Sequence, residues 1–334
     1  MRIGIYGAGS IGCHVGGMMA CSGMDPLLVG RDAMARRLAG GIMLTGHDGQ
    51  ERFAPPGSFC FSTSPVPLAD CDCVLVAVKS PATREAGTTL AGILRPGTVV
   101  ASFQNGVANA GILREELAAM EVLACVVGYN VAQVGPNRFH RGTDGAIMVG
   151  DGAGALALAI ALLDAGLPAM VRRDIVAVQW GKLLLNLNNA VNALSGLPLR
   201  SQLLNREWRN VLAASIEEAL MILQAAGIRP ARVAKAPPAL LPFLLRLPDF
   251  LFERVAASML AIDGMARSSM AEDLERGRDP ETDQLNGEIV RLAASIGRHA
   301  PVNAQLCAMV AELFATRPPV HPGPHEVLRR LGTA

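Results

Sequence analysis

A strand that runs directly into a glycine-rich turn opens this chain and limits its fold more than any other feature. Residues 1–6 are short and apolar, the turn Gly7-Ala8-Gly9-Ser10-Ile11-Gly12 follows, and residues 13–21 have the small, apolar character of a buried helix. In this setting Gly7 permits the tight turn, Gly9 lets the backbone approach a pyrophosphate, and Gly12 allows close helix packing. The helix N-terminus then faces the phosphates. The pattern predicts a dinucleotide-binding Rossmann domain in which residues 7–12 contact the cofactor.

The end of the next predicted strand, residues 26–30, indicates which cofactor is bound. An NAD enzyme usually carries an acidic residue there for the ribose hydroxyls, whereas this chain has Gly30 followed by Arg31. Arg31 suits a 2′-phosphate, so we expect NADP(H). Arg36 and Arg37 lie one helical turn further on, where they either add positive potential or form a solvated helix face.

The two halves of the chain differ in their predicted secondary structure. The first half alternates strands with helices at 81–90 and 107–118, which predicts a mostly parallel sheet. Segments 42–45, 52–54 and 130–140 are expected to be shorter antiparallel additions, and 146–149 an edge strand. From residue 174 onward the pattern is helical. We therefore predict an α/β Rossmann-type domain over residues 1–172 and an all-α substrate and catalytic domain over 173–334. The main strands are expected at 1–6, 26–30, 73–78, 98–103 and 122–127, and the later helices at 174–194, 202–226, 248–262, 281–297 and 303–315.

Two apolar segments constrain the fold further. Residues 153–163 form the longest apolar run, which is shorter than the roughly 18 residues of a membrane span and is expected to be a buried helix. Residues 230–248 contain five prolines and cannot form one straight helix. We interpret this second segment as a kinked apolar lobe or a partner surface.

Charge and composition exclude several classes of protein. The net charge is +1 and no basic tract is present, so a nucleic-acid partner is not expected. The glycine turn interrupts any signal-peptide core, and we expect a cytoplasmic protein without a membrane partner. The seven cysteines lie in apolar stretches, which predicts buried reduced thiols. Neither the cysteines nor the six histidines have metal-ligand spacing, so no metal is expected and the proton donor must be sought among other residues.

Polar residues on otherwise apolar segments mark a candidate site. Lys182 and Asn186 lie on one predicted helix, and a second segment, about a hundred residues further along the chain, contains Ser269 and Glu281. Lys79 and Asn105 follow two predicted strands, at the edge of a parallel sheet where ligands bind. Other readings remain open: Lys182 as a lysine that extends from an apolar helix to solvent, Lys79 as a solvated strand-end residue, and Asn105 as a helix N-cap.

Together these motifs resemble the 2-dehydropantoate 2-reductase (ketopantoate reductase) family. The resemblance extends in order over nearly the whole chain, from the glycine turn through Gln104-Asn105-Gly106 to Asn286-Gly287. It implies NADPH-dependent reduction of ketopantoate to D-pantoate, a step in pantothenate biosynthesis. It makes Lys182 the proton donor and Ser269 the residue that holds the substrate carboxylate. Glu281 becomes the partner of the new hydroxyl and of Lys182, and a cofactor contact. The remaining roles implied are orientation of Lys182 and substrate by Asn105 and Asn186, cofactor contact by Asn105, and a position between cofactor and substrate for Lys79.

Some residues depart from the family pattern around the expected substrate pocket. Ala190 stands where relatives usually have an asparagine, and the nearby candidates for that role are Asn188, Asn189 and Asn192. We expect Asn192 to contact the substrate, because Asn192-Ala-Leu-Ser195 resembles the family's Asn-x-Leu-Thr with two extra residues before it. Ala266 and Pro280 also differ from the usual residues. A paralogue that reduces another 2-oxo acid is therefore one alternative, and a non-catalytic NADPH-binding sensor is another. We expect a small 2-oxo acid as the partner and leave a homodimer open.

Overall fold

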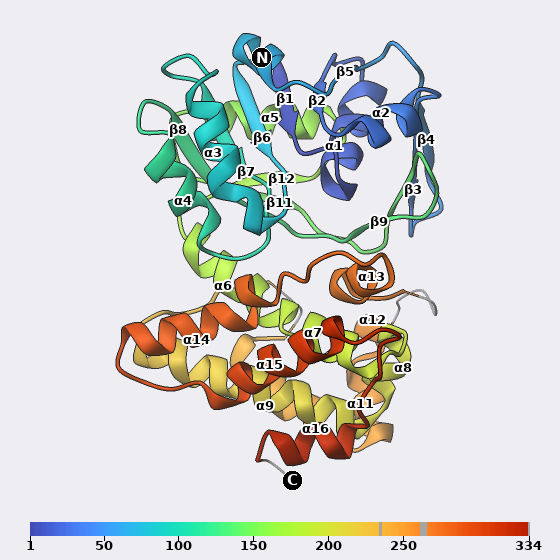
Figure 1. The fold of residues 1–334 in the computed structure, drawn as a ribbon, viewed down its shortest axis with the longest axis vertical. Coiled ribbons are helices and arrows are strands. Elements are labelled where there is room, and N and C mark those ends of the chain that lie inside the picture. Colours follow the sequence, from blue (N-terminus) through green and yellow to red (C-terminus); the bar gives the residue numbers. More distant parts are fainter. Residues whose placement is uncertain (234–235, 261–265, 333–334) are drawn as a thin grey trace. The chain divides into compact units, whose positions relative to one another are not determined.

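The computed structural model describes residues 1–233, 236–260 and 266–332. The packing of its residues divides the chain into two compact units, Met1–Ile175 and Val176–Ala334 (Figure 1). The sequence places the boundary near residue 172.

An eight-stranded sheet forms the core of the first unit (Figure 1). Its order is β12-β11-β8-β7-β6-β1-β2-β5, and the paired strands are parallel except for β11 and β8. The predicted α/β class with a parallel core is confirmed. In chain order the strands are β1 (Ile3–Tyr6), β2 (Leu27–Val29), β5 (Cys60–Ser62), β6 (Cys73–Val76), β7 (Val99–Ser102), β8 (Glu121–Val127), β11 (Ile147–Gly150) and β12 (Ala169–Arg172).

Two strands of this sheet have no clear signal in the sequence. β5 has three residues and β12 four, so each is too short to give a clear strand pattern. Because β12 pairs with β11, the prediction that residues 146–149 form the edge was wrong. The strand that β11 contacts on its other side, β8, runs antiparallel to it.

The shorter strands form a separate four-stranded sheet rather than additions to the main one. Its order is β4-β3-β10-β9, built from β3 (Ile42–Gly46), β4 (Glu51–Ala54), β9 (Val131–Gln133) and β10 (Arg138–Arg141). The β3–β4 and β9–β10 pairs are antiparallel as expected, but β10 and β3 are parallel. This pairing joins segments that are about a hundred residues apart, which local pattern cannot predict.

Helices cover both faces of the main sheet. Helix α1 (Ser10–Cys21) and α5 (Ala155–Asp164) pack into one apolar core, and α3 (Thr83–Ala91) and α4 (Asn109–Glu116) pack into the other. The prediction that this apolar segment forms a buried helix was wrong in part: Leu156, Ile160 and Leu163 of α5 are each at least half exposed. These side chains recur every three or four residues and so share the outer face of the helix. The short helices of this unit are η1 (Val66–Asp70), η2 (Ser80–Ala82) and α2 (Asp32–Leu38).

The second unit is helical, as predicted, but its helices are shorter than the apolar pattern suggests. The segment 174–194 divides into α6 (Ile175–Asn186) and α7 (Asn188–Ser195), and 202–226 divides into α8 (Leu199–Leu204) and α9 (Arg206–Ala225). Asn205 separates the last two, and its side chain accepts the amides of Glu207 and Trp208, so it ends one helix and caps the next. The remaining helices are η3 (Pro238–Leu240), α10 (Leu241–Arg246), α11 (Asp249–Val255), α12 (Ala257–Leu260), α13 (Ser269–Glu275), η4 (Thr282–Gln284), α14 (Asn286–Ser295), α15 (Pro301–Ala315) and α16 (Pro324–Arg330). The expected end of the 248–262 helix lies outside the described residues.

A buried arginine organises the proline-rich segment. Arg209, on α9, is fully buried and donates to the carbonyls of Leu245 and Leu247 at the end of α10 and to those of Leu203 and Leu204 at the end of α8. It also pairs with Asp249 at 2.7 Å. One cation therefore satisfies carbonyls that two helix ends leave without intrahelical partners.

The cysteines are only partly as predicted. All seven are free, and four are buried, but Cys60 is exposed and Cys21 and Cys307 are half-buried. Cys60 lies on the short edge strand β5, where one face meets solvent.

Candidate active site

The glycine turn has the close backbone packing that its sequence predicts. Gly7 has φ +118°, and a Cβ there would lie 2.6 Å from the backbone of Ala77 and Val78. A Cβ on Gly12 would lie 2.1 Å from the Gly7 carbonyl oxygen. Both positions therefore require glycine for reasons inside the fold.

Gly9 differs, because the fold itself leaves room for a side chain there. A Cβ on Gly9 would meet no atom of the described residues within 4 Å. The amides of Ser10, Ile11 and Gly12 also donate no hydrogen bond within the described chain, since the first bond of α1 runs from Cys13 to the Gly9 carbonyl. Free amides at a helix N-terminus beside an open backbone fit the pyrophosphate of a dinucleotide.

Arg31 is the second residue after β2 and follows Gly30. A Cβ on Gly30 would lie 2.6 Å from the Cβ of Ala8, so the end of β2 packs closely against the glycine turn. Arg31 is exposed and forms no ion pair with any residue that the structure describes. The guanidinium is therefore available to an anionic group of a ligand bound on the turn.

Lys79 and Asn105 lie at the carboxyl ends of the neighbouring parallel strands β6 and β7. The two loops are joined, because the Ser80 hydroxyl donates to the Asn105 carbonyl at 3.2 Å. Asn105 is exposed and does not cap α4, whose N-cap position is Ala108. The side chain that binds this loop is Asn109, which is buried at the start of α4 and donates to the Asn105 carbonyl. No motif in the sequence distinguishes this asparagine, so it was not predicted.

Lys182 lies on α6 of the second unit, one helical turn before Asn186, so the two side chains share one face of that helix. The helix is approached closely at the preceding residue, since a Cβ on Gly181 would lie 2.2 Å from the Ala231 carbonyl oxygen. Burial lowers the pKa of Lys182 from 10.5 to about 8. A lysine with this pKa is still mostly protonated at neutral pH and releases its proton more readily than an exposed one.

Ser269 is the first residue of α13 and is exposed at that helix terminus. Asn189, on α7, donates from Nδ2 to the Ser269 hydroxyl at 3.3 Å. Asn192 is fully buried instead, where its Oδ1 accepts the Ser268 amide at 2.9 Å and its Nδ2 donates to the Leu197 carbonyl at 2.9 Å. Asn192 thus joins α7 to α13, and Asn189 is the amide beside Ser269.

Glu281 is partly buried at the N-cap position of the 3-10 turn η4 rather than on a helix. The next residue, Thr282, donates to the sulfur of Met270 on α13 at 3.5 Å, which brings the Glu281 turn and the Ser269 end of α13 into one region of the unit. Asn286 of the same motif is fully buried and donates to Asn303 at 3.0 Å, so it fastens α14 to α15.

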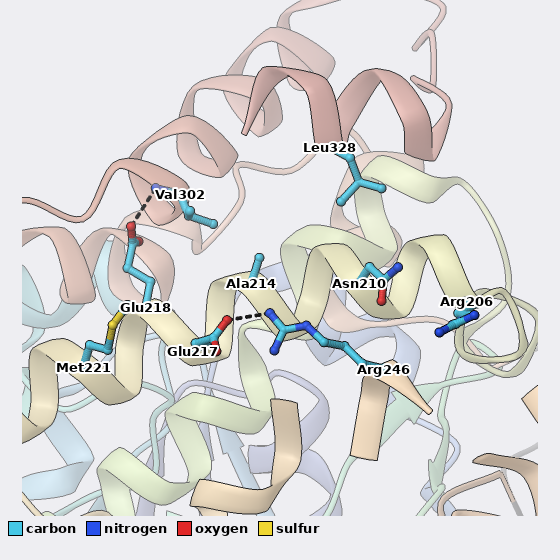
Figure 2. Close-up of a pocket in the computed structure, with 9 residues that line it drawn as sticks. All are labelled: Arg206, Asn210, Ala214, Glu217, Glu218, Met221, Arg246, Val302 and Leu328. Atoms are coloured by element: carbon cyan, nitrogen blue, oxygen red, sulfur yellow. Dashed lines mark hydrogen bonds and ion pairs between the residues drawn. The ribbon is translucent and has the colours of Figure 1, made fainter. Parts of the chain in front are cut away.

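A cavity of about 500 Å³ in the second unit is lined by residues other than the predicted site residues (Figure 2). Arg246 on its wall pairs with Glu217 at 2.5 Å, and the Glu218 carboxylate accepts the amide of Val302 at 2.9 Å (Figure 2). No predicted site residue is among the described residues that line it. Its polar groups hold helices together, and we assign it no role in the chemistry.

Over the described ranges no helix is long and apolar enough to cross a membrane.

Both units of the chain match models of one protein family. The family model described as ketopantoate reductase PanE/ApbA matches residues 3–154, and the model of that family's C-terminal region matches residues 174–314. A 2-dehydropantoate 2-reductase of Caulobacter vibrioides is 30% identical over 75% of this chain and 80% of its own length. One from Halobacterium salinarum is 27% identical over 93% of this chain and 98% of its own.

A solved structure is also similar. The PanE/ApbA family ketopantoate reductase from Ralstonia eutropha JMP134 superposes with a TM-score of 0.80 and 29% identity, over 94% of this chain and 98% of that one. Since the two family models together span both units, the chain belongs to the ketopantoate reductase PanE/ApbA family and is an oxidoreductase.

Proposed function

We propose that the chain reduces 2-dehydropantoate to D-pantoate with NADPH, as a step in pantothenate biosynthesis. The observation that carries the proposal is Lys182, a partly buried lysine whose pKa is lowered to about 8 and which shares a helix face with Asn186. The names of the relatives from Caulobacter vibrioides and Halobacterium salinarum support the choice of substrate.

The residues of the first unit suit a phosphorylated dinucleotide. Open backbone at Gly9 and the free amides of residues 10–12 fit the pyrophosphate, and Arg31 fits a 2′-phosphate. Asp32 follows Arg31 at the start of α2, where an acidic side chain is favoured by the helix N-terminus itself. Its presence is thus explained without a ribose contact, and NADPH remains the expected cofactor.

Lys182 would donate the proton in the reduction. The reduced nicotinamide, when bound, supplies the hydride to the carbonyl carbon of the substrate. Negative charge then develops on the carbonyl oxygen, and the Lys182 ammonium stabilises it and transfers a proton from Nζ. Asn186, one turn further on, would orient the lysine, and Glu281 would accept a hydrogen bond from the new hydroxyl and contact the cofactor.

The substrate carboxylate would be held at the start of α13. Ser269 is exposed there, and Asn189 donates to its hydroxyl. Because the Asn192 amide is used inside the fold, Asn189 rather than Asn192 would contact the substrate. Lys79 and Asn105 would contribute from the strand ends of the first unit.

A paralogue that reduces a different 2-oxo acid is the second candidate, and Ala190 favours it. This residue is fully buried on α7 where relatives usually have an asparagine, so an amide expected near the substrate is absent. A pocket with one fewer polar group discriminates between branched 2-oxo acids mainly by apolar contacts of about 1–3 kcal/mol per methylene.

The experiment compares kcat/KM for ketopantoate with that for pyruvate, 2-oxoisovalerate and benzoylformate, each with NADPH and with NADH. We expect ketopantoate with NADPH to be turned over best, and the gene to restore growth of a pantothenate auxotroph that lacks the reductase. A competitor turned over about tenfold better, equivalent to about 1.4 kcal/mol in transition-state stabilisation, together with failure to complement, transfers the assignment to the paralogue. NADPH binding without oxidation in the presence of these acids would instead favour a sensor.

A further inference from the structure

A buried cluster of polar side chains joins the loop after β6 to the loop after β7. We name it the loop-pair network and define it as Ser80, Thr83, Ser102, Gln104 and Asn109. Ser80, Thr83, Ser102 and Asn109 are each at most 5% exposed. The β6–β7 ladder is complete without them, since strand pairing uses only backbone groups. Buried polar side chains cost stability unless they bind something, so their contacts indicate what the cluster does.

Asn109 holds the Asn105 loop. Its Nδ2 donates to the Asn105 carbonyl oxygen at 2.5 Å and to the Ser80 hydroxyl at 3.1 Å. The Ser80 hydroxyl, in turn, donates to the same Asn105 carbonyl at 3.2 Å. The peptide after Asn105, which leads into Gly106 at φ +89°, is therefore held by two side-chain donors.

Gln104 and Thr83 hold the Lys79 loop. The Gln104 Nε2 donates to the Val78 carbonyl at 3.1 Å and to the Thr83 hydroxyl at 2.7 Å. The Thr83 hydroxyl lies 2.8 Å from both the Ser80 carbonyl and the Asn109 Oδ1, and its single proton serves these two acceptors. The Gln104 Oε1 accepts from the Ser102 hydroxyl at 3.0 Å, which fixes the orientation of the amide.

Every carbonyl that the network binds lies next to Lys79 or belongs to Asn105. We propose that Thr83, Gln104 and Asn109 are positioning residues, which set the backbone from which Lys79 and Asn105 reach the cofactor and substrate. This inference rests on the proposed function only in the roles that it gives to those two side chains. Misplacement of a binding group by about 1 Å can lower the rate about a hundredfold, so a rigid connection between the loops has a functional consequence.

Thr83→Val tests the proposal, because valine has nearly the shape of threonine and lacks only the hydroxyl. Thr83→Ser is the matched control, since it keeps the hydroxyl and loses a methyl group. We expect Thr83→Val to raise the Kd for NADPH and the KM for the 2-oxo acid by about tenfold and to lower kcat. Thr83→Ser should stay within about threefold of the unchanged protein in all three quantities.

A double-mutant cycle separates positioning from a general effect on stability. The same Thr83 substitution is made in a Lys79→Ala, Asn105→Ala background, where the network keeps its backbone acceptors but has no functional side chains to position. If Thr83 acts through Lys79 and Asn105, Thr83→Val should change the NADPH Kd by less than about twofold in that background. An equal change in both backgrounds overturns the proposal, as does a Thr83→Val protein whose Kd, KM and kcat match those of Thr83→Ser.

If Thr83→Val does not fold, Gln104→Met replaces it in the same cycle and is judged by the same two outcomes. The NADPH Kd needs no turnover, so the cycle can be completed even if no 2-oxo acid is reduced. In that case the proposed function fails while the positioning role is still decided by the binding data.

Discussion

Replacement of Lys182 by methionine should stabilise the protein and abolish most of its activity. Burial lowers the pKa of this lysine from 10.5 to about 8, so the folded protein disfavours the charged form. A shift of this size corresponds to about 3 kcal/mol as an upper limit, at about 1.4 kcal/mol per pKa unit. Because the side chain keeps partial contact with solvent, we expect Lys182→Met to gain about 2 kcal/mol at pH 7.

The sign of the pH dependence follows from the direction of the shift. Below about pH 8 the lysine is charged in both the folded and the unfolded state, and the folded state carries the whole penalty. Between pH 8 and 10.5 the folded lysine is neutral while the unfolded one still binds a proton, so the penalty decreases. The gain from Lys182→Met should therefore be full below pH 8 and decrease as pH approaches 10.5.

Activity should change in the opposite direction. Loss of a general acid typically lowers kcat by about a hundred- to ten-thousandfold. In the unchanged protein kcat should decrease between pH 7 and 9, because a group with a pKa of about 8 goes from about nine-tenths to about one-tenth protonated over that range. The residual activity of Lys182→Met should lack this dependence.

Urea denaturation at pH 7 and pH 10, with kcat measured from pH 6 to 9.5, checks both effects. Lys182→Arg is the matched control: it keeps the charge over this whole range, so it should give no pH-dependent gain in stability and should not restore the kinetic pKa. A kcat for Lys182→Met within about threefold of the unchanged protein would refute the role as proton donor. A change in the free energy of unfolding that is equal at pH 7 and 10 would refute the argument from burial.

Three further tests address other parts of the structure. Arg31→Ala should weaken NADPH use by about ten- to a hundredfold and should barely change NADH use, which is consistent with loss of a charge-assisted hydrogen bond of about 1.5–3 kcal/mol. Arg36→Ala, one turn further on, is the control. Equal use of both cofactors by the unchanged protein would contradict the assignment. Arg209→Met should lower the free energy of unfolding by about 3–5 kcal/mol in urea titrations, since four backbone carbonyls lose their donor, and a loss below about 1 kcal/mol would be inconsistent with that burial. Asn192→Ala should lower the melting temperature more than Asn189→Ala, whereas Asn189→Ala should raise the KM for the 2-oxo acid more; the reverse order would return the substrate contact to Asn192.

The parts of the fold that were predictable are those with a local physical cause. The glycine turn is an example, because Gly7 adopts a positive φ and Gly12 packs against the Gly7 carbonyl, five residues before it. The parallel core likewise follows from alternating apolar strands and helices. Strand β5 and the β3–β10 pairing were not predictable, since one is three residues long and the other depends on partners far apart in the chain.

The candidate site could likewise be predicted only in part: the sequence indicates which helices contribute to it, but not which side chains are available to a ligand. Lys182 and Asn186 are related by helix periodicity, so their common face could be predicted from spacing. The choice between Asn189 and Asn192 could not, because both are asparagines on one short helix and differ only in what surrounds them. Asn192 is held by the Leu197 carbonyl and by the Ser268 amide, groups that only the folded chain brings there. A motif therefore identifies the helix that contributes to the site, whereas the hydrogen-bond partners of each amide decide which side chain remains available to a ligand.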